Sequence, residues 1–409
     1  MTAHPITTPL PGAAADPEVD VPVPRRWLVL AVGLGAGAVL AYFFAVTQRY
    51  NLDLVVYRSA VRWWWGGHDP YQHLYTVHHL AFTYPPFALV ALSPLAVLPR
   101  EVSELGWLLV NVAALSAGFY VVLRRLGIRG GTDLWLAVAA LSCLSVFLVE
   151  PVRSTIDYGQ VNAVIMAACL FDMLWPGLRA RGVLVGLAAA VKLTPLAFLL
   201  YFAVRRDLRA LGRAAVAFAL GTGVAWLLLP SASHAFWTSL VWDPERTGKL
   251  TYPGNLSWDA VVVRTGLDPS AARHLWMAAA LVTVVVGAVA AVRCTRAGAD
   301  VATVFVVALT GLLVSPVSWS HHWIWVVVGI PLVFSGRELP LRLRLLVSGL
   351  LVLTLLAPYW WFHPGGAASV AEALVPGWAF AVLTVTALTG LHAGRPSTRV
   401  GPGHSLVAV

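Results

Sequence analysis

The chain has 409 residues, of which 59% are hydrophobic and only 11% are charged. Soluble domains contain about 25% charged residues, so this composition excludes an ordinary water-soluble protein. The formal net charge of +9 does not indicate nucleic-acid binding, because the basic residues are mostly arginines grouped in short clusters between apolar runs. Such clusters are typical of the cytoplasmic loops of membrane proteins.

The apolar runs predict helices. In lipid the backbone must satisfy its own hydrogen bonds, which leaves only helices or closed barrels. Barrel strands would alternate apolar and polar residues, whereas these runs are continuously apolar. The sequence therefore predicts an all-α, polytopic membrane protein with about 12 transmembrane or re-entrant helices. The apolar segments lie at 27–46, 86–98, 104–123, 133–149, 161–175, 183–203, 213–229, 274–293, 301–315, 322–334, 343–361 and 371–391.

The composition also predicts the domain organisation. Residues 1–24 are rich in proline, alanine and threonine, which is typical of a disordered tail, and 392–409 are expected to form a second tail. Residues 25–391 are expected to form one membrane domain with two long loops, 47–85 and 230–273. The arginine bias places both loops outside and both termini in the cytoplasm, as in a multi-pass plasma (inner) membrane protein.

The path of the chain through 86–203 has two alternatives. If 86–98 crosses the membrane, the arginines within 124–129 lie outside. If 86–98 is re-entrant, those arginines lie inside, which the charge bias favours. A matching irregularity at 183–203 would then restore the parity of crossings. Residues 192–195, with the sequence Lys-Leu-Thr-Pro, interrupt that segment as in a broken helix.

Asp53 follows the first apolar segment directly, at the expected boundary with water. Desolvation there can tune a carboxylate toward work as a general base. The plainer role is the N-cap of an interfacial helix, and both roles stay open. Tyr57, one helical turn on, would share the face of Asp53, and Arg62 is two turns on. The tryptophans at 63–65 are typical of a helix lying among lipid headgroups.

Polar residues also interrupt later apolar segments. Ionisable groups in lipid mark functional sites by default, although Lys192 could also reach the interface with its long side chain. Adjacent histidines point to different faces of a helix, and no carboxylate shares their segment, so hydrogen bonding or phosphate binding is favoured over a metal site. The interrupting residues are Glu150, Arg153, Asp157, Gln160, Asn162, Lys192 and, at 318–323, Ser-Trp-Ser-His-His-Trp.

Taken in order, these residues resemble glycosyltransferase family 87, a family of the GT-C superfold. Each matching motif is short, but they follow the family's order from residue 53 to residue 322. The motifs are Asp53 with Tyr57, Asp69-Pro70-Tyr71, Tyr84-Pro85-Pro86, Gly159-Gln160-Val161-Asn162, Lys192-Leu193-Thr194-Pro195 and 315–322, Ser-Pro-Val-Ser-Trp-Ser-His-His.

The resemblance implies an inverting α-mannosyltransferase with polyprenyl-phosphomannose as donor and an extracytoplasmic site. The pattern most resembles members that add α-1,2-mannose to a glycolipid acceptor, phosphatidylinositol mannoside. By resemblance Asp53 is the catalytic base. Independently of the resemblance, the chemistry of Arg58, Arg62, Lys192 and His322 makes them candidates for binding the donor phosphate. The full set of expected substrate-binding residues is Tyr57, Arg58, Arg62, Tyr84, Gln160, Asn162, Lys192, Trp319, His321 and His322.

The residue inventory fits this chemistry. Displacing a sugar phosphate with inversion needs one base and no strong acid, because the leaving phosphate is already a stable anion. No Asp-x-Asp pair for a nucleotide-bound metal stands out, so we expect no metal and no other cofactor. The expected partners are the donor, the glycolipid acceptor and membrane lipids, with no nucleic acid. Two alternatives remain: a lipid-phosphate transporter or flippase, and a related transferase for lipomannan branching or arabinose.

Overall fold

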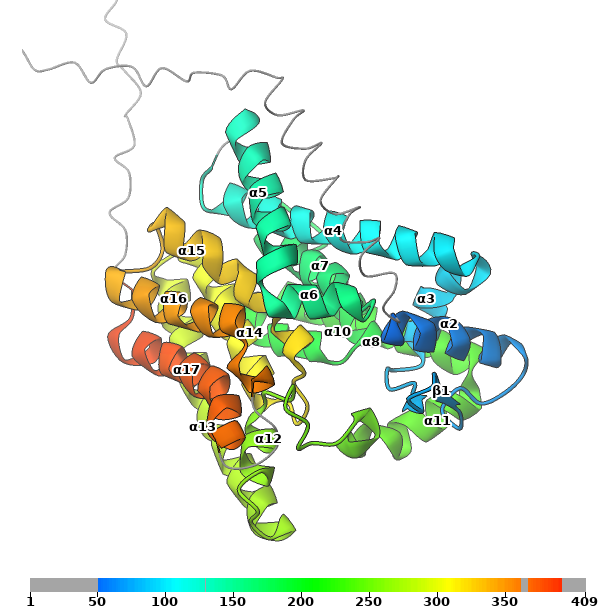
Figure 1. Ribbon diagram of the computed structural model, residues 1–409. Coiled ribbons are helices and arrows are strands. Elements are labelled where there is room, and N and C mark those ends of the chain that lie inside the picture. The colour runs from blue at the N-terminus through cyan, green and yellow to red at the C-terminus, as the bar shows by residue number, and fades with distance from the viewer. Residues whose placement is uncertain (1–50, 129, 362–366, 392–409) are drawn as a thin grey trace, which may run out of the picture.

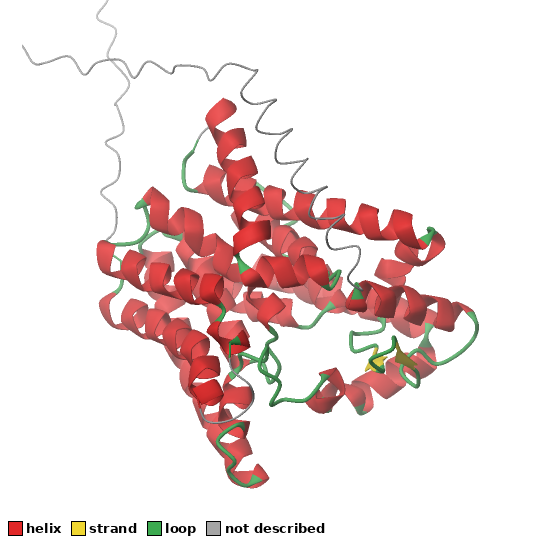
Figure 2. Ribbon diagram, in the orientation of Figure 1, coloured by secondary structure: helices red, strands yellow, loops and turns green. Residues whose placement is uncertain are grey.

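The computed structural model describes residues 51–128, 130–361 and 367–391. The expected tails and the first apolar segment, 27–46, lie outside the described residues. Helices dominate the described part (Figure 2). Its two short strands, β1 (Leu74–Tyr75) and β2 (Leu80–Ala81), pair antiparallel in the loop that follows the first described helix.

Most helices follow the apolar segments, because a helix satisfies the backbone within the segment itself. In the first half of the chain they are α2 (Leu52–Trp65), α3 (Phe87–Val97), α4 (Arg100–Arg125), α5 (Thr132–Leu148), α6 (Glu150–Asp157), α7 (Asn162–Leu174), α8 (Val183–Val191), η1 (Thr194–Phe198), α9 (Leu199–Val204) and α10 (Leu208–Leu228). In the second half they are α11 (Pro230–Thr238), η2 (Leu240–Trp242), η3 (Pro244–Thr247), α12 (Trp258–Val263), α13 (Pro269–Arg296), α14 (Asp300–Val314), η4 (Ser320–Val328), α15 (Gly329–Ser335), α16 (Leu341–Leu356), η5 (Pro358–Trp360) and α17 (Ala367–Thr389). Elements marked η are 3-10 helices. Of the α-helices, α2, α11 and α12 lie within the expected long loops 47–85 and 230–273.

Within the described ranges, five helices are long and apolar enough to cross a membrane: α4, α10, α13, α16 continued through η5, and α17. α5 and α6 would make a sixth span, with a bend of 79° between them. The other apolar helices have 10–17 residues. The predicted all-α, polytopic membrane fold is therefore confirmed, while the number of spans and the sidedness of the loops stay predictions.

Several arginine-bearing loops meet at one end of the bundle, which we call the basic end. Asp300, the first residue of α14, forms ion pairs with Arg125 at the end of α4 and with Arg205 just after α9. Arg337, which follows α15, donates a hydrogen bond of 2.7 Å to the carbonyl oxygen of Leu126. The loops after α4, α9 and α15 thus share one end of the molecule with the start of α14.

The segment from α8 to α9 leaves the basic end and returns to it. Gly182, just before α8, lies so close to the start of α10 that a Cβ would come within 2.1 Å of the carbonyl oxygen of Ala210. Lys192 then interrupts the helix with an extended backbone (φ −149°, ψ 127°), and Arg205 ends the excursion at Asp300. The predicted break is confirmed, and the segment is a hairpin.

α3 keeps both of its ends near α2 (Figure 1). Before α3, the hydroxyl of Tyr84 accepts a hydrogen bond from Tyr57 of α2. At the end of α3, the carbonyl oxygens of Leu95 and Leu98 accept hydrogen bonds from Arg58 of α2. This arrangement agrees with the re-entrant alternative for 86–98, in which the arginines of 124–129 join the other arginine-bearing loops.

Candidate active site

Asp53 lies in the first turn of α2, half-buried. The N-cap of the helix is Asn51, and the backbone N–H of Asp53 donates to the carbonyl oxygen of Tyr158 at 2.9 Å, so the capping role considered for Asp53 is wrong. Burial raises the pKa of Asp53 to about 6, although a hydrogen bond from Gln160 and the positive charge of Lys192 both lower it. A carboxylate with this pKa suits a general base near neutral pH.

Two tyrosines and Gln160 form a buried hydrogen-bonded group beside Asp53. Tyr57, one turn after Asp53 on α2, donates to the hydroxyl of Tyr84 at 2.8 Å. Tyr84 in turn donates to the side-chain oxygen of Gln160 at 2.6 Å. The side chain of Gln160 also hydrogen-bonds to the carboxylate of Asp53. Since that carboxylate can only accept, Gln160 offers its NH₂ group to Asp53 and its oxygen to the tyrosines.

Lys192 brings a positive charge into the same group. Its Nζ donates to Oδ1 of Asn162 at 2.8 Å and to the hydroxyl of Tyr84 at 3.1 Å, and it lies 3.1 Å from Nε2 of His322. All three partners are neutral, and the Lys192 side chain is only 6% exposed. A buried cation with neutral partners attracts an anion such as a phosphate. We call Asp53, Tyr57, Tyr84, Gln160, Asn162, Lys192 and His322 the site cluster.

The two histidines extend the cluster from η4. When Lys192 is an ammonium, Nε2 of His322 accepts its hydrogen bond, and the proton of that ring is then on Nδ1, which has no partner in the part of the chain that the structure describes. The carbonyl oxygen of His321 accepts hydrogen bonds from Asn162 at 3.0 Å and from Thr155 at 3.2 Å, so the backbone of η4 is fixed. Nε2 of His321 is buried and has no partner within the described residues. A buried unpartnered nitrogen beside the cluster suits contact with a substrate.

Three other expected residues lie outside the site cluster. Arg58 donates to the carbonyl oxygens of Leu95 and Leu98 at the end of α3, and Arg62 donates to that of Ala96. Arg62 faces away from Asp53 because nine residues at about 100° each amount to two and a half turns of the helix. Phosphate binding by either arginine stays a prediction that this geometry does not support. Trp319 lies edge-on to Tyr252, with 5.8 Å between ring centroids.

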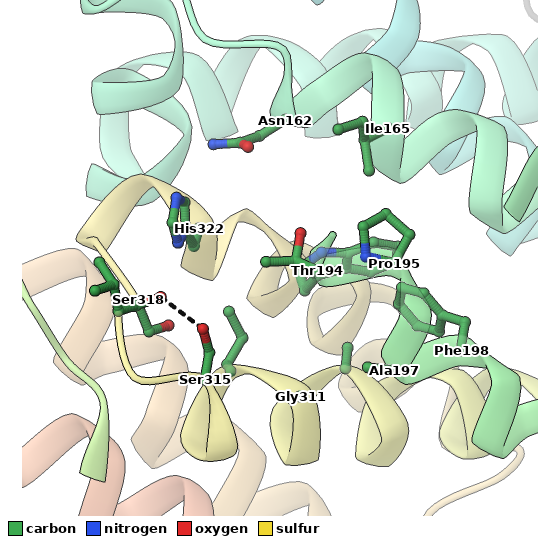
Figure 3. A pocket seen from close by; sticks show the side chains of 14 residues that line it. Asn162, Ile165, Thr194, Pro195, Ala197, Phe198, Gly311, Ser315, Ser318 and His322 are labelled. Carbon is green, nitrogen blue, oxygen red and sulfur yellow. Dashed lines mark hydrogen bonds between the residues drawn. The ribbon is translucent and has the colours of Figure 1, made fainter. Parts of the chain in front are cut away.

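A pocket opens next to the site cluster, between η1 and α14. Figure 3 shows Asn162 and His322 at one end of it and Pro195 and Phe198 at the other. The pocket thus passes from hydrogen-bonding side chains to an apolar lining. That gradient fits a ligand with a polar head and a hydrocarbon continuation.

Glu150 and Tyr158 contribute in ways that the sequence did not reveal. The carboxylate of Glu150 is buried and accepts hydrogen bonds from four side chains. It therefore ties α6 to η4 and η5. The donors are Ser154, Ser320, Tyr359 and Trp360. The position of Glu150 at the end of an apolar segment marked it as unusual, but three of these donors lie more than 160 residues away. Tyr158 helps to hold Asp53, because its carbonyl oxygen accepts a hydrogen bond from the backbone N–H of Asp53. In the sequence, only its place beside Gly159 and Gln160 marked it.

A profile of glycosyltransferase family 87 matches residues 82–316. A *Mycolicibacterium smegmatis* protein named as a polyprenol-phosphate-mannose-dependent α-(1-2)-phosphatidylinositol mannoside mannosyltransferase is 34% identical over 390 residues, which cover 87% of each chain. Its *Mycobacterium tuberculosis* namesake is 31% identical, covering 91% of this chain and 93% of the relative.

A further *M. tuberculosis* protein, named for phosphatidylinositol pentamannoside, is 34% identical and covers 87% of this chain and 83% of its own. No solved structure matches this chain. The family profile covers more than half of the chain, and the similarity to these relatives runs along most of its length. The chain belongs to glycosyltransferase family 87.

Proposed function

We propose that this protein transfers mannose from polyprenyl-phosphomannose to a phosphatidylinositol mannoside, forms an α-1,2 linkage, and does so on the extracytoplasmic face of the plasma membrane. The names of its relatives support this donor and acceptor. The observation that carries the proposal is the site cluster, which holds the Asp53 carboxylate and the Lys192 ammonium together and joins them through neutral side chains.

The transfer step uses each charge separately. Asp53 takes the proton of an acceptor hydroxyl, and the oxygen attacks C1 of mannose from the side opposite the phosphate. The bond between C1 and the phosphate oxygen breaks, and its electron pair leaves on the polyprenyl phosphate. Attack from the opposite side inverts C1, so an α-linked product requires a β-linked donor. Lys192 stabilises the negative charge that grows on the phosphate.

The pocket supports a lipid-linked donor. Asn162 and His322 lie at its polar end, where the phosphate would reach Lys192. Phe198, Leu312 and Trp325 line the apolar part, which suits the isoprene units nearest to the phosphate. We also propose that transfer needs no metal, because Lys192 supplies positive charge at the leaving group. Full activity in the presence of EDTA is the expected result.

Orientation is part of the proposal. Arg125, Arg205 and Arg337 gather at the basic end, and arginine-bearing loops favour the cytoplasm. Asp53, Lys192 and the long loop 230–273 then face the outside, and both termini face the cytoplasm. The transporter alternative predicts movement of a lipid without bond cleavage, whereas membership of a glycosyltransferase family favours transfer.

Transfer measured in membranes tests the proposal. Membranes from a strain that lacks the protein are complemented with the wild type or with Asp53→Asn and supplied with polyprenyl-phosphomannose. We expect the wild type to extend phosphatidylinositol mannosides and Asp53→Asn to lose at least about 100-fold in rate while remaining folded. Asp53→Asn turnover near that of the wild type would disprove the base assignment. Arabinosylated products, or extension of lipomannan alone, would favour the related-transferase alternative.

A further inference from the structure

Three aromatic side chains from distant parts of the chain meet beside the site cluster. The ring of Tyr252 lies 5.8 Å, centroid to centroid, from the ring of Trp319 and 5.8 Å from the ring of Trp360. Tyr252 is 49% exposed and Trp360 is 37% exposed. We call these three residues the aromatic platform. This exposure leaves ring surface open to a ligand, a partner or lipid.

The platform is rigidly held. The carbonyl oxygen of Tyr252 accepts hydrogen bonds from Arg264 at 2.6 Å and from the backbone N–H of Asn255 at 2.9 Å. The indole N–H of Trp360 donates to the buried carboxylate of Glu150 at 3.0 Å. Side chains whose positions are fixed before binding lose little conformational entropy when a ligand arrives, as a built binding site requires.

Two glycines let the backbone approach the indole rings. A Cβ on Gly254 would come within 2.8 Å of the ring of Trp360. A Cβ on Gly248, whose φ is +122°, would come within 3.1 Å of the ring of Trp319. The loop 230–273 therefore packs against two of the rings, and the lack of a side chain at Gly248 and Gly254 makes room for this contact.

The platform adjoins Asp53 through Tyr158. The backbone N–H of Asp53 donates to the carbonyl oxygen of Tyr158, and the Tyr158 side chain lies within electrostatic range of both Asp53 and Tyr252. The Tyr158 ring also contacts His321, with 5.6 Å between centroids. Lys192 and His322 thus lie on the side assigned to the donor phosphate, while Tyr158 links Asp53 to the surroundings of Tyr252.

We propose that the aromatic platform is the acceptor-glycan subsite, on which mannose units of the acceptor stack through their C–H faces while the reacting hydroxyl reaches Asp53. The inference rests on the proposed function, because it requires a mannoside acceptor. Neutral aromatic faces suit an uncharged sugar, and the three rings pack edge to face, at 74° between Tyr252 and Trp319 and 67° between Tyr252 and Trp360. A role in membrane anchoring would instead make the platform equivalent to the more exposed tryptophans of the same region, Trp242 (77%) and Trp361 (59%).

Kinetics with a water-soluble acceptor separate these roles. Purified full-length protein in detergent is assayed with saturating polyprenyl-phosphomannose and a methyl α-dimannoside, which has no lipid anchor. For Tyr252→Leu we expect the acceptor KM to rise about tenfold and the donor KM to stay within about twofold. Tyr252→Phe, Trp242→Leu and Trp361→Leu should match the wild type. Equal effects of Tyr252→Leu and Trp242→Leu, or an unchanged acceptor KM in Tyr252→Leu, would overturn the inference.

Binding without donor distinguishes the failure of the inference from failure of the proposed function. Titration of the methyl α-dimannoside, followed by tryptophan fluorescence, should show saturable binding that Tyr252→Leu weakens and Tyr252→Phe retains. Such binding in a wild type that transfers no mannose would support the platform as a mannoside-binding site and overturn the proposed function. Transfer by the wild type combined with equal affinities in all variants would overturn the platform alone.

Discussion

At the scale of single residues, the site is defined by two charges that are joined indirectly. Lys192 donates to the hydroxyl of Tyr84, Tyr84 donates to the side-chain oxygen of Gln160, and Gln160 donates through its nitrogen to Asp53. Every donor in this chain points toward Asp53, so each bond polarises the next. A direct ion pair would make both charges less available. This series of hydrogen bonds leaves the carboxylate able to accept a proton and the ammonium able to bind an anion.

The pH dependence of transfer should report Asp53. Its pKa of about 6 lies above the ordinary value of 3.8, and only the ionised form can take a proton. We expect kcat/KM to fall as the pH drops below about 6. In Gln160→Leu the carboxylate loses a hydrogen bond that lowers its pKa, so the acid limb should move to higher pH. An unmoved acid limb in this variant, measured from pH 4.5 to 8, would contradict the assignment.

The same pKa has a consequence for stability. The folded protein holds the Asp53 proton more tightly than the unfolded chain, so this residue makes the fold less stable as the pH rises from about 4 to 6. Asp53→Asn should therefore melt at or above the temperature of the wild type at pH 7, although it loses activity. A lower melting temperature would show that the carboxylate stabilises the fold and would leave the loss of activity without a chemical interpretation.

Lys192→Met should weaken the donor side of the reaction selectively. Removing the cation takes away charge stabilisation at the leaving phosphate, for which losses of about 100-fold or more in kcat/KM are typical. The acceptor KM should change little. The matched control is Lys249→Met, which alters the other lysine of the chain, an exposed one in loop 230–273. Equal activities of the two variants would exclude Lys192 as the phosphate partner.

At the scale of elements, the break at Lys192 is fixed on both sides. Before it, α8 packs so tightly on α10 that a Cβ on Gly186 would lie 2.2 Å from the carbonyl oxygen of Ala214. After it, η1 packs on α14, where a Cβ on Gly311 would lie 2.7 Å from the Cβ of Ala197. Small residues allow such close helix contacts in membranes. The lysine therefore projects from a rigid corner.

A buried ion pair fixes loop 230–273 in a comparable way. Arg264 and Glu372 of α17 lie 2.7 Å apart, and their side chains are 6% and 4% exposed. Removing one partner leaves an uncompensated buried charge, so Glu372→Ala should destabilise the protein by about 3–5 kcal/mol. The double variant Arg264→Met with Glu372→Leu should recover much of that loss. Thermal unfolding in detergent checks both, and a double variant less stable than Glu372→Ala would contradict the coupling.

Local patterns predicted more of the elements than of the contacts between them. Continuous apolar runs predicted the long helices but not α11 and α12, which lie within the predicted loop 230–273, and Lys192 with Pro195 predicted the break. The family motifs brought together Asp53, Gln160 and Lys192 as candidates, and the structure places them in one cluster. Arg62 lies on the opposite side of α2 from Asp53, because nine residues make two and a half turns rather than two. The ties made by Glu150 were invisible, because pairing across more than 160 residues leaves no local pattern.

At the scale of the whole molecule, the arginine-bearing loops of the basic end and the site cluster lie at different ends. Asp300 gathers Arg125 and Arg205 at the basic end, while Lys192, between Gly182 and Arg205 in the chain, reaches the site cluster. This separation is what a membrane enzyme needs if its loops obey the charge bias and its site faces outward. The arrangement is consistent with the re-entrant path of the chain between 86 and 203.

Cysteine labelling in cells should reveal this sidedness. In a chain whose Cys143, Cys169 and Cys294 are replaced by alanine, we expect Lys249→Cys to react with a membrane-impermeant maleimide in intact cells. Arg209→Cys, at the start of α10, should react only after permeabilisation. Both positions are exposed, so access alone decides the outcome. The reverse pattern would place the site cluster in the cytoplasm and overturn the proposed orientation.

The hydrogen bonds of Lys192 also impose an order on biosynthesis. Two partners, Tyr84 and Asn162, precede it by 108 and 30 residues, but His322 follows it by 130 residues. At about 5–20 residues per second, the ribosome needs roughly 6 to 26 s to supply that last partner. Lys192 thus enters the membrane with upstream partners already made, and η4 completes its surroundings late in translation. A chain released before residue 322 would be inactive however well its first helices had assembled.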